Sequence, residues 1–176
     1  ADLVLAMFLL GHEFTPDLKR RNFAFYDPIT TGDSSLSACI QSIMAAEVGE
    51  MDKALDYARV ATLMDLGDVA GNVKDGCHIA AMGGVWMIFV YGFAGMRDYG
   101  GLLCFWPSLP DVLHCIRFQL RYQGQTLEVN VGQQATQYQL KSGSGLTILH
   151  EEEEVKLSPD SPSIERPNRT HEAGSK

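Results

Sequence analysis

Two short stretches in the first half of the chain carry residues that could bind an anion. Ser34 and Ser35 follow the stretch at residues 26–33 and lie at the start of a segment with helical periodicity. Hydroxyl groups and unpaired backbone N–H groups at a helix start form an anion site, so this position could hold a phosphate. Ordinary capping of the helix by Asp33 or Ser34 is the alternative, and the residues taken alone favour it.

The second stretch is centred on His78, which begins a long apolar segment. Gly83 and Gly84 follow it, and such small residues let a neighbouring group or a ligand approach the backbone closely. Lys74 lies four residues before His78 and could add positive charge. The alternatives are a histidine that serves as a cap or core residue and a lysine in contact with solvent, and the residues taken alone favour both.

The composition gives little support to other chemistry. The four cysteines form no C-x-x-C pair, so we expect no metal site and interpret them as reduced thiols of a cytoplasmic protein. The formal net charge is −8 and no basic cluster exceeds residues 19–21, so we expect no nucleic-acid partner. The apolar run at residues 3–10 is too short to span a bilayer, so we expect no membrane partner.

The residues that would position the two stretches have the periodicity of helices. Apolar side chains recur at helical spacing up to about residue 98, interrupted by a glycine-rich loop at residues 67–77. Thr15 and Pro16 form a strong helix start, because a hydroxyl cap precedes a proline at the first helical position. The predicted helices span residues 1–10, 16–25, 34–48, 51–65 and 78–96.

The periodicity changes after Arg97, which we interpret as a structural link between two parts. Residues 115–122 alternate apolar and polar side chains, and turns at residues 123–124 and 142–145 separate further alternating segments, which predicts antiparallel hairpins. Pro, Ser and charged residues dominate from residue 158, which predicts disorder. The expected division is a helical part (1–98), an antiparallel β-domain (99–158) and a disordered tail (159–176).

Three long strings identify a family. YDPITTGDSSLSACIQSIMAAEVG, GDVAGNVKDGCHIAAMGGVWM and GFAGMRDYGGLLCFWPSLP occur in this order and resemble the C-terminal third of the family 65 glycoside phosphorylases. That family includes maltose, trehalose and kojibiose phosphorylases, and the resemblance covers about residues 1–160. It implies an α+β chain: the last helical hairpins of an (α/α) six-hairpin barrel, then a small antiparallel β-sandwich-like domain.

The resemblance also implies a reaction. Family members cleave an α-linked disaccharide with inorganic phosphate and yield β-glucose 1-phosphate with inversion. One Glu acts as general acid, and phosphate replaces the water and base of an inverting hydrolase. Ser34, Ser35 and His78 match the family's phosphate contacts, and Gly83 and Gly84 would give access to the backbone. Phosphate is then a co-substrate, no further cofactor is expected, and a homodimer is the assembly that the family suggests.

Two departures from the family limit this expectation. Some members carry His where this chain has Gly32, so one polar contact is missing. The family's catalytic Glu belongs to an acidic motif upstream of these strings, so we expect no catalytic residue in this chain and no activity of the chain alone. The chain opens inside an apolar run, which suggests a C-terminal fragment. A trehalase-like hydrolase of the same family and an inactive structural β-domain module remain as alternatives.

Overall fold

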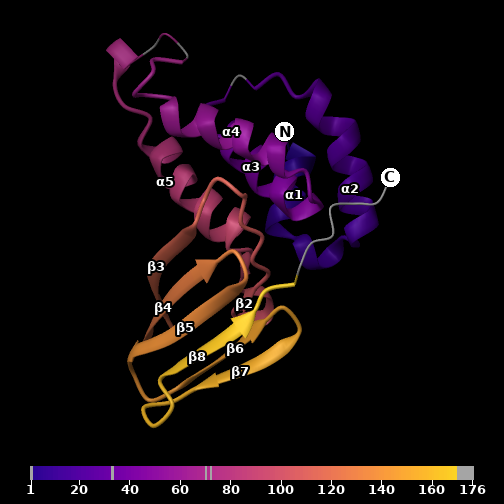
Figure 1. Cartoon of the computed structure of the whole chain (residues 1–176). Coiled ribbons are helices and arrows are strands. Elements are labelled where there is room, and N and C mark those ends of the chain that lie inside the picture. The colour runs from indigo at the N-terminus through magenta and orange to yellow at the C-terminus, as the bar shows by residue number, and fades with distance from the viewer. Residues whose placement is uncertain (1, 33, 70, 72, 170–176) are drawn as a thin grey trace. The chain divides into compact units, whose positions relative to one another are not determined.

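The computed structural model describes residues 2–32, 34–69, 71 and 73–169, and within the chain two compact units are distinguished. The helical unit is Ala1–Gly92 and the β-unit is Phe93–Lys176. Figure 1 shows the helices in the first unit and the strands in the second. The expected boundary between residues 98 and 99 lies a few residues after this division, because the last helical turns end earlier than predicted.

The helical unit consists of the predicted helices with small shifts at their ends. They are α1 (Asp2–Leu9), α2 (Pro16–Tyr26), α3 (Ser37–Val48), α4 (Met51–Leu63), α5 (Ile79–Met87) and the π-helix η4 (Ile88–Phe93), with short 3₁₀ turns η1 (Gly11–Glu13), η2 (Asp27–Ile29) and η3 (Val73–Asp75). The start of α2 is the predicted one, since Thr15 Oγ1 accepts a hydrogen bond of 3.3 Å from the Leu18 N–H. Helix α3 ends at Gly49, whose φ of 88° is left-handed.

Helix α3 is the centre of the helical unit. Most of its side chains are buried, polar as well as apolar, and it contacts α1, α2, α4 and α5. A helix that is buried on nearly all sides needs partners for its polar groups. Ser42 finds one on α4, where its hydroxyl donates to the Ala54 carbonyl at 2.8 Å.

Two predicted helix ends are wrong. Helix α3 begins at Ser37 and not at residue 34, because residues 34–36 form a turn in which Ser34 Oγ accepts from the Leu36 N–H. The last helix becomes a π-helix after Met87 and ends at Phe93, not at residue 96. Gly95, at φ 61°, turns the chain away, and a Cβ there would lie 2.6 Å from the Trp106 carbonyl carbon, so only glycine fits.

The β-unit has two four-stranded sheets. The first has the order β1 (Met96–Arg97), β2 (Cys104–Phe105), β6 (Leu146–His150), β7 (Glu153–Leu157), and the second β3 (Cys115–Tyr122), β4 (Gln125–Gly132), β5 (Ala135–Ser142), β8 (Ser163–Pro167). The antiparallel hairpins are confirmed with one exception, because β2 pairs with β6 in parallel, Cys104 opposite Leu149. The core takes alternate residues of both sheets, among them Leu127 and Val129 of β4 and Ile148 of β6.

The predicted disorder from residue 159 is wrong for the residues that form β8. Ile164 of this strand lies opposite Tyr138 of β5, and the ladder continues to Pro167 opposite Ala135. The composition of the segment is polar, but pairing with an existing sheet edge satisfies its backbone and needs only one apolar side chain. Residues 170–176 of the expected tail lie outside the described part of the chain.

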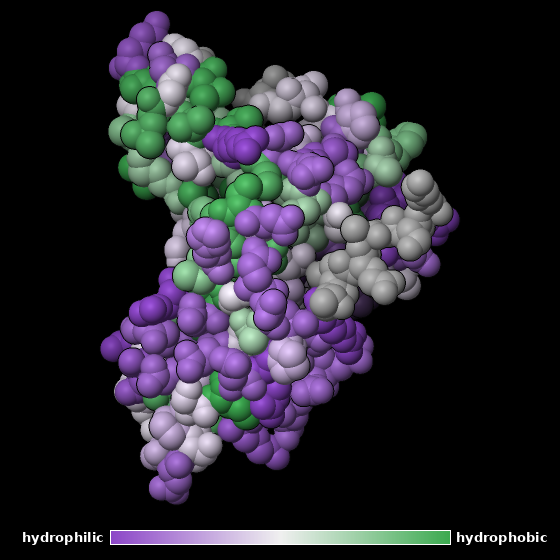
Figure 2. All heavy atoms as spheres, in the orientation of Figure 1, coloured by the Kyte–Doolittle hydropathy of each residue, from purple (hydrophilic) through white to green (hydrophobic). Residues whose placement is uncertain are grey.

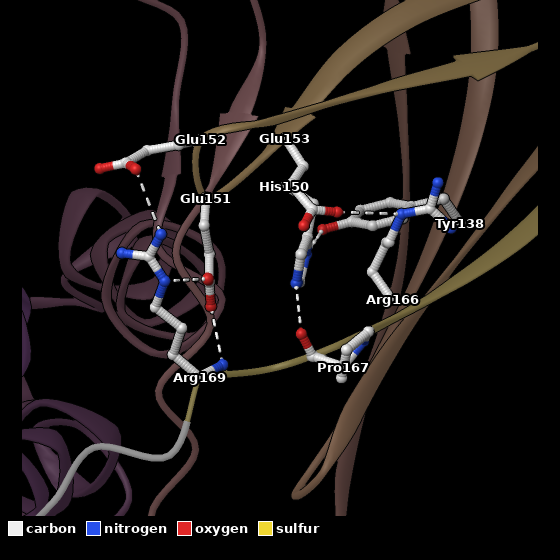
Figure 3. Close-up of polar contacts among 8 residues, drawn as sticks. All are labelled: Tyr138, His150, Glu151, Glu152, Glu153, Arg166, Pro167 and Arg169. Atoms are coloured by element: carbon white, nitrogen blue, oxygen red, sulfur yellow. Dashed lines mark hydrogen bonds and ion pairs between the residues drawn. The ribbon is translucent and has the colours of Figure 1, made fainter.

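A buried histidine joins the two sheets of the β-unit (Figure 3). His150 of β6 is 2% exposed, and its Nε2 donates to the Pro167 carbonyl of β8 at 3.0 Å. Its Nδ1 therefore accepts, in the neutral ring, from the Tyr138 hydroxyl of β5 at 2.8 Å. Beyond the strand, Arg169 pairs with Glu151 at 2.7 Å. The C-terminal strand is thus tied to the other sheet through side chains as well as to β5 through its backbone.

Among the helices of the described residues, none is both long and apolar enough to cross a bilayer.

Candidate anion site

The starts of α3 and α5 lie side by side. Cys39, in the first turn of α3, is 3.8 Å from the carbonyl of Ala81, in the first turn of α5. One turn further, Gly84 packs directly against Cys39. Later still, a Cβ on Gly92 would lie 3.5 Å from the Ile43 Cα. Contacts that advance together along both helices mean that the helices run in the same direction, so both N-termini lie at one end of the unit.

Ser34 and Ser35 precede the α3 start by one turn. Ser34 is exposed, and its hydroxyl accepts from the Leu36 N–H at 3.3 Å, while its carbonyl accepts from the Ser37 N–H at 3.0 Å. Ser35 is half-buried. One part of the capping alternative is therefore present, because Ser34 stabilises the turn that leads into the helix. Asp33, the other capping candidate, lies outside the described residues.

His78 is the N-cap residue of α5 and is held by a carboxylate. The Asp65 side chain accepts from the His78 backbone N–H through Oδ2 at 3.0 Å and from the ring Nδ1 through Oδ1 at 2.6 Å. Both side chains are largely shielded, with 13% of Asp65 and 22% of His78 exposed. The His78 side chain forms no capping bond to its own helix. Its ring orientation is thus set from outside α5.

This contact favours the charged form of Asp65. The hydrogen bond from the His78 ring, with smaller contributions from the His78 backbone N–H and its charge, lowers the pKa of the Asp65 carboxyl below its ordinary value. A general acid needs a carboxyl that keeps its proton near neutral pH. Asp65 is ionised there, so it is unsuited to be the acid.

The remaining predicted site residues occupy different environments. Gly83 is exposed, with open space where a side chain would be, whereas Gly84 is buried against α3. The close packing of α3 and α5 is therefore a structural reason for a glycine at position 84. It stands in addition to the access to a ligand that was expected from the sequence. Lys74 is exposed on the turn η3, before His78 in the chain.

The two glycines allow a matched test of this packing. Gly84→Ala should destabilise α5 by about 2 kcal/mol, because the new methyl group would lie 2.9 Å from Cys39 Cβ and closer still to its sulfur. Gly83→Ala should stabilise the same helix by up to about 1 kcal/mol, since alanine is the better helix former and space is open. Native-state hydrogen exchange of the α5 amides measures both effects. Equal shifts in the two variants would contradict this packing.

A second polar cluster was not predicted from the sequence. Asp27, which is buried at the end of α2, accepts from Gln41 of α3 at 3.1 Å and from the Tyr57 hydroxyl of α4 at 2.8 Å, and Lys53 lies 3.2 Å away. Burial and the Asp27 hydrogen bond raise the pKa of Tyr57 well above its ordinary value. The cluster fixes the point from which the segment with Ser34 leaves α2.

Asp65 was missed as well, because nothing in the sequence distinguishes it from an ordinary residue at a helix end. Its partner is 13 residues away across the glycine-rich loop. Among the described residues, no three His, Cys, Asp or Glu side chains gather as metal ligands. The arrangement of two adjacent helix starts, hydroxyls and an oriented imidazole is one that suits a small anion.

Both units match models of known protein families. The profile described as "Glycosyl hydrolase family 65 central catalytic domain" matches residues 1–87, and that described as "Glycosyl hydrolase family 65, C-terminal domain" matches residues 96–157. The two matches correspond to the helical unit and to most of the β-unit.

Individual proteins of known name are similar over most of the chain. An alpha,alpha-trehalose phosphorylase of Geobacillus stearothermophilus is 43% identical over 92% of the chain, and a maltose phosphorylase of Bacillus subtilis is 36% identical over 89%. A solved structure, a putative kojibiose phosphorylase from the human microbiome, superposes with a TM-score of 0.88 over 96% of the chain at 27% identity. The chain spans about one fifth of the length of the curated relatives, 21% in both cases, and 22% of the solved chain.

Proposed function

This chain belongs to glycoside hydrolase family 65, and from that premise we propose that it is the phosphate-binding part of a longer, inverting disaccharide phosphorylase. The reaction is attack of inorganic phosphate on the anomeric carbon of an α-linked disaccharide, which releases β-glucose 1-phosphate and the second sugar. The named relatives are phosphorylases of trehalose, maltose and kojibiose.

One observation carries this proposal: the α3 and α5 starts lie side by side at one end of the helical unit. The packed helix axes are about 8–10 Å apart, so a phosphate between the two starts can face both. Ser34 and Ser35 reach it from one helix and His78 from the other, while the partial positive charge of both helix ends favours an anion.

The general acid is proposed to come from the rest of the longer protein. Asp65, the carboxylate beside His78, is ionised and already bound. The exposed apolar side chains of α5 support a larger assembly: Ile79 is 71% exposed, Met82 48% and Trp86 47%. Figure 2 shows apolar residues gathered over this end of the helical unit. The other helices of the family's central domain would cover them.

The test is phosphate-dependent cleavage by the intact protein. With phosphate present, it should release glucose 1-phosphate from one of maltose, trehalose or kojibiose, and NMR of the product should show the β anomer. The purified chain alone should release none, because it lacks the acid. Release of glucose that does not depend on phosphate would indicate the trehalase-like hydrolase, and an intact protein without any cleavage would indicate a structural module.

A further inference from the structure

We propose that Asp65 is a positioning residue, which acts through His78 to orient the imidazole toward the phosphate. The proposal rests on the proposed function, because it concerns the same site. Asp65 itself does not contact the phosphate. It fixes the residue that does.

The geometry leaves His78 little freedom. One carboxylate oxygen binds the backbone N–H at 3.0 Å and the other binds the ring at 2.6 Å. The first contact fixes the backbone of His78 where α5 begins, and the second fixes the rotation of its ring. Two contacts to one rigid carboxylate therefore determine both the position and the direction of the imidazole.

The charge of Asp65 also determines which ring nitrogen of His78 carries the proton. An ionised carboxylate can only accept, so Nδ1 carries a hydrogen and donates it. The opposite nitrogen, Nε2, is then the atom that the pairing directs away from Asp65. Without its histidine partner, the Asp65 carboxylate would repel a phosphate. A favourable interaction with the anion therefore depends on both residues.

A purely structural role for Asp65 predicts something different. Asp65 follows α4 and ties the end of the glycine-rich loop to it, so its loss could loosen the fold. A loosened fold would impair phosphate and disaccharide binding together and would do so whether or not His78 is present. A positioning role impairs phosphate binding selectively and only through His78.

The experiment is a double-mutant cycle in the intact protein, with Asp65→Asn, His78→Ala and the double variant. Asp65→Asn should raise the apparent KM for phosphate about tenfold, leave the KM for disaccharide nearly unchanged, and cause no further weakening in the His78→Ala background. Asp56→Asn is the matched control: the same substitution at an exposed residue of α4 that pairs with Arg59 should alter neither constant.

Three results would overturn the proposal: an unchanged phosphate KM in Asp65→Asn, an equal rise for both substrates, or the same loss in both backgrounds. If Asp65→Asn does not fold, Asp65→Glu is the second variant, because it keeps a carboxylate acceptor. Its loss of affinity should again be confined to phosphate, and a loss of affinity for both substrates would count against positioning. A wild-type protein without phosphate-dependent cleavage overturns the proposed function as well, whereas an active wild type with a silent Asp65→Asn overturns only the role of Asp65.

Discussion

In the intact protein, His78→Ala should raise the apparent KM for phosphate tenfold to a hundredfold. A hydrogen bond to a charged group contributes about 1.5–3 kcal/mol, and each 1.4 kcal/mol is a factor of ten in affinity. The effect should fall at the upper end of this range, because removing the imidazole also leaves the Asp65 carboxylate without its 2.6 Å partner near the anion. The KM for disaccharide should change little, since we expect the sugar contacts to come mainly from the rest of the longer protein.

Ser35→Ala should act in the same direction on the other helix start. Ser35 is half-buried beside the beginning of α3, and its hydroxyl is proposed to donate to the phosphate. Ser163→Ala, an exposed serine on β8, is the matched control and should leave the phosphate KM unchanged. The constants are measured by initial rates at saturating disaccharide. If His78→Ala and Ser35→Ala both keep the wild-type value, these residues are ordinary caps and the site proposed here is wrong.

Sequence patterns predicted the helices wherever side-chain chemistry acts locally. Thr15 caps α2, and Gly49 ends α3, because a hydroxyl next to a proline and a left-handed glycine need no distant partner. The alternation in residues 115–122 predicted β3 for the same reason, since every second side chain of a half-buried strand must be apolar. The helix-then-strand order, and with it the α+β class, followed from these local signals.

Features that depend on distant partners could not be predicted in this way. β8 is a strand because β5 offers it an edge, and its own composition is that of a solvated tail. Helix α3 begins at Ser37 and not at the predicted residue 34, because the Ser34 hydroxyl accepts from the Leu36 N–H. Capping rules do not decide between such a turn and a helix that begins earlier. The Asp65 carboxylate has a role only once the loop folds back to bring His78 to it.

The family resemblance supplied what the residues alone did not. Taken singly, Ser34 and His78 favoured capping, and their spacing of 44 positions gave no reason to join them. The packing of Cys39 against Ala81 and Gly84 provides a physical link, because it brings both helix starts to one end of the unit. Gly84 can have two explanations, since it permits this packing and the family resemblance also implies that it gives a ligand access to the backbone.

The β-unit should depend strongly on His150. His150→Ala removes the donor to the Pro167 carbonyl and the acceptor of the Tyr138 hydroxyl at once, and it leaves a cavity between the sheets. A buried polar group without a partner costs about 1–3 kcal/mol, so a total loss of about 3 kcal/mol is expected. The amides of β8 should then exchange with solvent roughly a hundredfold faster, because 1.4 kcal/mol corresponds to a factor of ten.

Two further variants distinguish the loss of the His150 hydrogen bonds between the sheets from a general effect of losing a side chain. Tyr138→Phe removes one hydroxyl and leaves the ring, so it should cost about 1 kcal/mol, and its effect should shrink in the His150→Ala background because the two groups share one hydrogen bond. His114→Ala, the same substitution at an exposed histidine of the β-unit, should change stability by less than about 0.5 kcal/mol. Native-state hydrogen exchange of β5 and β8 compares all of them. If His150→Ala and His114→Ala shift the exchange of β8 equally, the contacts of His150 between the sheets contribute nothing to the stability of the C-terminal strand.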